Sequence, residues 1–139
     1  IMFDLDNFKL ANDVFGHDFG DTMIVQNARK LKSYFRSDDI VCRIGGDEFI
    51  VLCKNISEKD VETKLNRIVD EMSTTRRGGG RDIIFSISAG YVMVPEQGTD
   101  FDDLYHKSDV ALFAAKMCGK CAFRKYDASM KTIRIELAK

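Results

Sequence analysis

The residues best suited to chemistry in this chain are acidic residues next to strand-like segments. Asp4 lies near the end of an apolar segment over residues 1–5, and Asp47-Glu48 directly follow a glycine pair. Paired negative charges would add little to a structural turn. They suit a hard cation, since Mg²⁺ prefers oxygen ligands and usually keeps substrate phosphates in its shell. If the two segments are neighbours, Asp4 and Asp47 can share one metal ion.

The residues around Asp47 predict how it is presented. Residues 40–42 and 49–53 are largely apolar, and Arg43-Ile44-Gly45-Gly46-Asp47-Glu48 lies between them. Such a pattern is typical of two short strands joined by a tight turn. Gly45 and Gly46 can adopt the positive φ angles that a two-residue hairpin loop requires. We therefore expect a β-hairpin that carries the acidic pair at its tip.

The rest of the chain predicts elements that would hold this hairpin. Helices are expected over 18–36, from a capping-box-like Ser57 to Met72, and over 100–117. Strands are expected over 1–5, 82–94 and 122–126, a loop or short helix over 6–16, a mobile surface loop over 76–81, and a short final helix. This order suggests an α/β (α+β) sandwich of the split βαβ, ferredoxin-like kind, with a mixed sheet and a central hairpin flanked by helices.

Composition excludes several classes of protein. The chain has 139 residues, enough for one domain with a core, and 45% are hydrophobic, as in globular proteins. Its 21 basic and 22 acidic residues give a net charge of −1, so there is no electrostatic case for binding nucleic acid or a membrane surface. Position 1 is an isoleucine in an apolar segment. We expect the chain to be cut, within its first strand, from a longer protein that could be membrane-anchored.

The cysteines leave alternatives open. Cys118-Gly119-Lys120-Cys121 has the spacing of redox and zinc sites. A structural zinc site needs a second close pair, and Cys42 and Cys53 are too far apart in sequence to provide one. The pair also follows a helical pattern instead of opening a helix. Reduced thiols in a cytoplasmic protein are the favoured interpretation.

Several motifs together resemble a known family. Residues 43–49 resemble the signature of the GGDEF domains, the diguanylate cyclases, and further resembling segments span positions 4 to 119. These are Asp4 to Lys9, Asn12-Asp13, Phe15-Gly16-His17, Gly20-Asp21, Ser86 to Gly90, Ser108-Asp109, Ala111 to Lys116 and Gly119. The resemblance implies one GGDEF domain over residues 1–139, with a fold similar to nucleotidyl cyclases and polymerase palms. It implies condensation of two GTP molecules into cyclic di-GMP, with release of two pyrophosphates, and a homodimer, because each site holds one GTP.

The resemblance also implies roles for the acidic residues and one lysine. Asp4, the backbone carbonyl of Leu5 and Asp47 would hold Mg²⁺ (or Mn²⁺). Asp47 would also act as general base on the 3′-hydroxyl, with Glu48 in a supporting role. Lys9 would stabilise charge that develops on the phosphate.

Substrate binding is assigned by the same resemblance. Gly45 and Gly46 would let the backbone approach the triphosphate, and Lys116 and Lys120 would bind phosphate. Asn12, His17 and Asp21 would form the base pocket. A carboxylate at Asp21 can accept hydrogen bonds from guanine N1–H and the 2-amino group, and adenine lacks both donors.

A regulatory site is implied by Arg36-Ser37-Asp38-Asp39, which ends five residues before Gly45. Arg36 and Asp39 would bind cyclic di-GMP for product inhibition, with Arg67 contributing from the second helix. Taken alone, this motif is equally explained by an arginine at a helix C-terminus and an aspartate in a turn.

Departures from the family pattern lie near both ends of the chain. The family's preceding helix and its Leu-Thr-Gly-Leu segment are absent. Lys120 replaces the usual arginine and loses its bidentate fork, and Cys121 replaces an asparagine.

A non-catalytic module that senses GTP or cyclic di-GMP is the alternative function. A cyclase making a mixed GMP–AMP product is a further alternative, disfavoured by Asp21.

Overall fold

The computed structural model describes residues 1–130 and contains six strands and four helices in that range. In chain order these are β1 (Met2–Asp6), α1 (Phe8–Phe15), α2 (His17–Ser33), β2 (Ile40–Gly45), β3 (Glu48–Leu52), α3 (Glu58–Glu71), β4 (Thr74–Gly78), β5 (Arg81–Tyr91), α4 (Phe101–Met117) and β6 (Phe123–Lys125). The predicted final helix lies outside the described residues.

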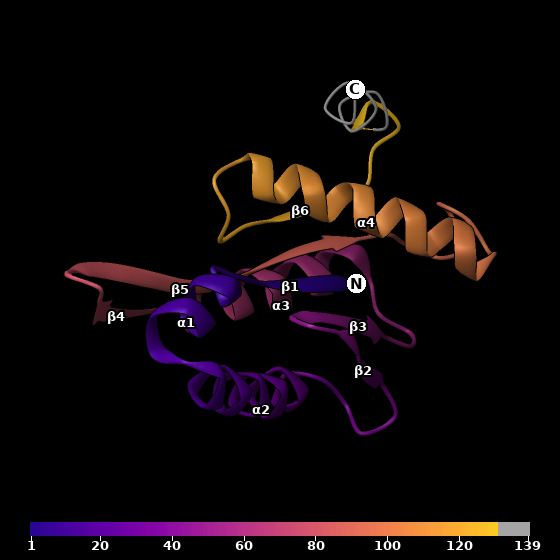
Figure 1. Cartoon of the computed structure of the whole chain (residues 1–139). Coiled ribbons are helices and arrows are strands. Elements are labelled where there is room, and N and C mark those ends of the chain that lie inside the picture. The colour runs from indigo at the N-terminus through magenta and orange to yellow at the C-terminus, as the bar shows by residue number, and fades with distance from the viewer. Residues whose placement is uncertain (131–139) are drawn as a thin grey trace.

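The strands form one mixed sheet. Their order is β2-β3-β1-β5-β4, and β6 pairs in parallel with β5 while the other pairs are antiparallel. The first strand therefore lies in the middle, between the hairpin strand β3 and the long strand β5 (Figure 1). This arrangement confirms the predicted fold class, a mixed sheet with a β-hairpin and flanking helices.

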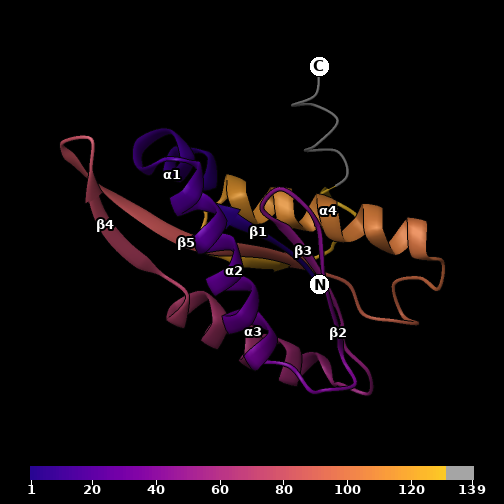
Figure 2. The same cartoon turned by 60° about the horizontal axis from the view of Figure 1, so that its bottom comes forward.

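Helices cover both faces of the sheet, with α4 on one side and α1, α2 and α3 on the other (Figures 1 and 2). The alternation of strand residues decides which side chains meet which helix. Phe3 and Leu5 of β1 point into the larger core with Ile24 and Leu31 of α2 and Leu65 of α3. Ile24, Leu31 and Leu65 belong to the apolar stripes that the sequence pattern predicts for the helices over residues 18–36 and 57–72.

The opposite face of the sheet approaches α4 closely. A Cβ atom at Gly90 would lie 2.1 Å from the backbone nitrogen of Leu112 and 2.3 Å from the carbonyl oxygen of Ser108. Only a residue without a side chain permits this approach. The strand β5 is continuous through Gly90. The glycine thus brings α4, and the lysine at its C-terminal end, against the sheet.

The prediction of a mobile surface loop over residues 76–81 is wrong. The segment is a hairpin in which Arg76 pairs with Ile83 and Gly78 with Arg81. The turn is made by Gly79 and Gly80, with φ angles of 60° and 78°. Glycines in a row suggest a break in structure, but two of them with positive φ also form a tight β-turn. Residues 8–15, predicted as part of a loop or short helix, form the helix α1. Within residues 1–130, no helix is long and apolar enough to span a bilayer.

Candidate functional site

The central position of β1 brings the two predicted acidic positions together. In the sheet register Asp4 of β1 lies opposite Glu48 of β3. The backbone N–H of Leu5 donates a hydrogen bond of 3.1 Å to the carbonyl oxygen of Asp47. The condition set by the sequence, that the first strand and the hairpin are neighbours, is therefore met.

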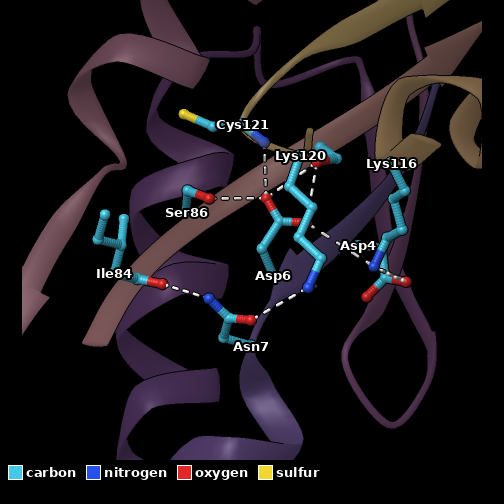
Figure 3. A network of polar contacts seen from close by, with 9 residues as sticks. Asp4, Asp6, Asn7, Ile84, Ser86, Lys116, Lys120 and Cys121 are labelled. Atoms are coloured by element: carbon cyan, nitrogen blue, oxygen red, sulfur yellow. Dashed lines mark hydrogen bonds and ion pairs between the residues drawn. The ribbon is translucent and has the colours of Figure 1, made fainter. Parts of the chain in front are cut away.

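Asp4 occupies an environment that opposes its negative charge. Its side chain is 15% exposed, and one of its oxygens, Oδ1, is buried without a hydrogen-bond partner in residues 1–130. The other, Oδ2, forms an ion pair of 2.8 Å with Nζ of Lys116 (Figure 3). Desolvation raises the pKa of Asp4 to about 7; Lys116 opposes this shift and the nearby Asp47 carboxyl adds to it.

These features fit a bound cation. Lys116 pairs with only one oxygen of Asp4. A second, buried oxygen without a partner, next to another carboxyl group, is unfavourable unless further positive charge binds there. Within the described residues, no group of three or more His, Cys, Asp or Glu side chains could hold a metal ion. Two carboxylates and a backbone carbonyl would leave positions for substrate oxygens, which is how Mg²⁺ is commonly held in phosphate-transfer sites.

The predicted hairpin is present, but its two-residue turn is Gly46-Asp47 and not Gly45-Gly46, because Gly45 still pairs with Glu48. Gly45 and Gly46 have φ angles of 147° and 49°, and the β2–β3 register shifts between Arg43 and Gly45. Nε of Arg43 donates to the carbonyl oxygen of Gly46 at 2.8 Å, which braces the turn. Burial raises the pKa of Glu48 next to it, and the negative charges of Asp109 and Asp47 raise it further. The tip thus concentrates negative charge with no Cβ atom at positions 45 and 46.

A shallow hollow of about 450 Å³ lies next to the acidic pair. Its lining includes three lysines with predicted roles at the phosphates, from distant parts of the chain: Lys9 of α1, Lys116 in the last turn of α4, and Lys120 in the loop after α4. Leu5 and Asp47 also line it. The fold therefore places three cations beside two residues expected to hold a metal, an arrangement suited to a polyphosphate.

The predicted base-binding residues lie at the junction of α1 and α2. His17 begins α2, and Asp21 follows one helical turn later; both are exposed. A Cβ atom at Gly20 would lie 1.7 Å from Oδ1 of Asn12, so this glycine makes room for the Asn12 amide. Asn12, His17 and Asp21 do not line the lysine-rich hollow, but α1 carries both Lys9 and Asn12.

The predicted regulatory residues lie around the loop between α2 and β2. Asp39 accepts hydrogen bonds from the backbone N–H of Arg36 at 2.9 Å and of Lys54 at 3.1 Å. Burial opposes the charge of Asp39, but these two donors, together with the positive charges of Lys64 and Arg36, lower its pKa. Arg67 of α3 pairs with Glu71 at 3.1 Å and stacks over the ring of Tyr34, close to the end of α2.

Sequence reasoning missed the role of Asp6 and Asn7. Asp6 is fully buried, and Asn7 accepts a hydrogen bond from Nζ of Lys120 at 3.1 Å while its Nδ2 donates to the carbonyl oxygen of Ile84 (Figure 3). The period of two in a strand was an available signal, since it places Asp6 on the same face as Asp4. A buried second aspartate needs donors, and the sequence did not show where they would come from.

The cysteines are free thiols, as expected. Cys42, Cys118 and Cys121 are exposed, and Cys53 is partly buried. Burial raises the pKa of the Cys53 thiol, an effect enlarged by the charge of Asp39.

Comparisons with known proteins agree with these features. The family model "Diguanylate cyclase, GGDEF domain" matches residues 1–121. The chain is 35% identical over 114 residues to the diguanylate cyclase DgcP of Escherichia coli, covering 81% of this chain and 33% of that protein. It is 34% identical over 130 residues to the cyclic di-GMP phosphodiesterase PdeR of E. coli, covering 94% of this chain and 20% of that protein. The chain thus spans about a fifth to a third of the length of these relatives.

Solved structures agree as well. The GGDEF domain of PA1120 (TpbB or YfiN) from Pseudomonas aeruginosa superposes with a TM-score of 0.85 at 31% identity, covering 95% of this chain and 78% of that one. The GGDEF domain of DgcB from Caulobacter crescentus, determined in complex with c-di-GMP, has a TM-score of 0.77 at 26% identity, covering 89% and 74%.

Proposed function

The chain belongs to the GGDEF domain family of diguanylate cyclases, and from this premise we propose that it condenses two GTP molecules into cyclic di-GMP and two pyrophosphates. The observation that carries the proposal is the position of Asp4. Its buried, unpartnered oxygen lies in the same site as Asp47 and the lysines of the hollow. A carboxylate oxygen that the fold buries without a hydrogen-bond partner is suited to a bound cation and its phosphate ligands.

In this proposal the chain's residues divide the work on the triphosphate. Lys9, Lys116 and Lys120 bind the phosphate oxygens, and Gly45 and Gly46 let the backbone approach them. Asp4, the carbonyl of Leu5 and Asp47 would hold Mg²⁺ or Mn²⁺. Such an ion lowers the pKa of an oxygen bound to it and offsets charge on the α-phosphate.

The proton of the 3′-hydroxyl goes to Asp47, and Glu48 supports the charge of the site. The 3′-oxygen of one GTP forms a bond to the α-phosphorus of the other. The bond from that phosphorus to the bridging oxygen breaks, and pyrophosphate leaves. Each site holds one GTP, so two copies of the domain must face each other, and the proposal includes a two-fold homodimer.

Guanine selection is proposed for the α1–α2 junction. The exposed carboxylate of Asp21 would accept from N1–H and the 2-amino group, and Asn12 offers both a donor and an acceptor. His17, at the start of α2, would complete the pocket. ATP lacks the two donors, so its binding would leave the Asp21 carboxylate unpaired.

Product inhibition is proposed for the loop between α2 and β2. Arg36 is exposed, and no carboxylate within residues 1–130 forms an ion pair with its guanidinium. Cyclic di-GMP would bind there through Arg36, with Asp39 and Arg67 beside it. The DgcB domain in complex with c-di-GMP supports the view that such folds bind the product. We place the domain in the cytoplasm, where GTP is available.

A non-catalytic module that senses GTP or cyclic di-GMP is the second candidate. It is favoured by the similarity to PdeR, which is named a phosphodiesterase. This chain nevertheless keeps Asp4, Lys9, Asp21 and Asp47, the residues that the chemistry requires.

The test is direct. The domain at high concentration is incubated with GTP and Mg²⁺, with ATP as the substrate control and Asp47→Ala as the matched variant, and the products are separated by chromatography. We expect cyclic di-GMP from GTP alone and none from the variant. Binding of GTP or cyclic di-GMP without turnover, persisting in a longer chain, would favour the sensor. Product formation by Asp47→Ala would refute the assigned base.

A further inference from the structure

Asp6 is a buried carboxylate that neither the metal nor the substrate uses in the proposed reaction. It ends β1, two residues beyond Asp4, and has no exposed surface. Its carboxylate collects donors from distant segments. Oγ of Ser86 donates to Oδ2 at 2.7 Å, Oγ of Ser88 lies 2.9 Å from both oxygens, and the backbone N–H of Cys121 donates to Oδ2 at 3.0 Å (Figure 3).

These donors join three parts of the fold. The two serines belong to β5, which pairs with β1, whereas Cys121 lies in the loop after α4. Burying a carboxylate is costly unless several donors satisfy it, and a group satisfied in this way holds its partners firmly. Asp6 therefore ties the loop after α4 to the centre of the sheet.

That loop has a backbone that needs a tether. Gly119, Lys120 and Cys121 have consecutive φ angles of 107°, 65° and 47°. Non-glycine residues in the left-handed region carry a conformational cost and persist where surrounding contacts impose them. The contacts here include the Cys121 N–H bond to Asp6, the bond from Lys120 to Asn7, and a contact of 3.8 Å from the Cys121 thiol to the carbonyl oxygen of Val69.

Asp6 also shares a lysine with the proposed metal site. Nζ of Lys116 lies 2.8 Å from Oδ2 of Asp4 and 3.7 Å from Oδ1 of Asp6. The Asp6 carboxylate thus contacts the loop that carries Lys120, and it also lies beside Lys116.

We infer that Asp6 is a positioning residue: its buried carboxylate holds the loop over residues 118–121 against β1 and thereby orients Lys116 and Lys120 toward the hollow. The holding of the loop is a property of the fold, and the effect on nucleotide binding rests on the proposed function.

The test compares Asp6→Asn with Tyr91→Phe. Asparagine keeps the size of the side chain but loses one acceptor and the negative charge. Tyr91→Phe is the matched control, because it removes a hydrogen bond to Glu62 from the far end of β5. Two quantities are measured: amide hydrogen exchange of Cys121 by NMR, and the dissociation constant of a non-hydrolysable GTP analogue by calorimetry.

We expect Asp6→Asn to accelerate exchange of the Cys121 amide and to weaken analogue binding, each by about tenfold or more, since bonds to charged groups are among the stronger ones. Tyr91→Phe should change neither quantity. If Asp6 contributed only to overall stability, Asp6→Asn would lower the free energy of unfolding, as Tyr91→Phe is expected to do, without a selective effect on this loop. If Asp6→Asn does not fold, Ser88→Ala removes one donor to the same carboxylate and should show the same effects at smaller size.

The outcomes separate this inference from the proposed function. Unchanged Cys121 exchange in a folded variant would overturn the inference, and so would faster exchange with unchanged analogue affinity. If the unaltered chain does not bind the analogue at all, the proposed function fails, and the exchange rate still decides whether Asp6 holds the loop.

Discussion

Asp4 and Asp39 lie in two sites predicted for phosphorylated ligands, but the surrounding structure shifts the pKa values of their carboxyl groups in opposite directions. Asp4 has a buried oxygen with no partner in residues 1–130 and a raised pKa. Asp39 receives two backbone N–H groups and has a lowered pKa. One oxygen of Asp4 is left without a partner while the other pairs with Lys116, whereas both oxygens of Asp39 already accept backbone N–H groups. Its neighbour Arg36 is the group left available for a ligand.

The largest effect on this comparison should come from Asp4→Asn. We expect cyclase turnover to fall by at least about a hundredfold, because a metal ligand is lost. The variant Asp70→Asn, at an exposed position of α3, is the matched control. Turnover within a few-fold of the unaltered chain would mean that Asp4 does not hold the ion.

The same substitution should change how stability depends on pH. The folded-state pKa of Asp4 is raised to about 7 from an ordinary 3.8, so its contribution is present below 3.8 and is lost as the pH rises through about 7. The free energy of unfolding of the metal-free domain should therefore fall over this range relative to that of Asp4→Asn. Denaturant titrations with a chelator measure it, and parallel pH profiles would contradict the assignment.

The next effect concerns the other site. Arg36→Ala should weaken inhibition by cyclic di-GMP by about tenfold or more, since a charged, forked donor is removed. Initial rates are measured at increasing product concentration, with Arg29→Ala on α2 as the control. Unchanged inhibition would leave the motif with only its structural role in the turn.

Gly20→Ala should sharpen the comparison within the substrate site. The new Cβ would displace the Asn12 amide, which lies 1.7 Å from its position, and we expect GTP affinity to fall several-fold, up to about tenfold. The domain should still fold, because alanine is favoured over glycine in a helix by about 1 kcal/mol. Val25→Ala, at an exposed position of α2, controls for changes to the helix surface. GTP affinity is measured by calorimetry, and an unchanged affinity of Gly20→Ala would contradict the role of Asn12.

The smallest effect is expected for Asp39→Asn. Loss of one charged acceptor in a partly solvated loop should cost at most about 1 kcal/mol in the free energy of unfolding. Because the pKa of Asp39 is lowered, its contribution is present above the ordinary value and is lost as the pH falls through the lowered one. The difference from the unaltered chain should vanish in acid. Asp38→Asn, next in sequence, serves as the control, and an equal loss there would show that the turn bonds add nothing.

The opposite treatment of Asp4 and Asp39 could not be predicted from the sequence. Both are aspartates beside a strand or turn, and each was assigned a ligand-binding role. The donors of Asp39 come from Arg36 three residues away and from Lys54 across the β2–β3 hairpin. The partner of Asp4 comes from Lys116, at the far end of the chain. Two of these three partners, Lys54 and Lys116, are distant in the sequence, and local pattern does not contain such long-range contacts.

Local pattern was sufficient where short-range physics decides the outcome. The glycine pair and its apolar flanks predicted the β2–β3 hairpin because positive φ angles and alternation are local properties. The helices α2 and α3 were predicted from their apolar spacing, and the start of α3 also from the cap at Ser57. The helix α4 was predicted over residues 100–117, and the structure shows that Asp100 caps it. The same local logic failed at residues 76–81, where a glycine run was a turn between paired strands.

The sequence by itself thus determined most of the elements, the presence of the β2–β3 hairpin and the kinds of residue gathered on them, because backbone preference and periodicity act over a few residues. The tertiary structure decided which of those residues meet. Only the placement of β1 between β3 and β5 unites Asp4 with Asp47, and only the approach of α4 at Gly90 brings Lys116 onto that pair. Burial then sets the charge state of Asp4, since the desolvation of a side chain depends on every segment packed around it.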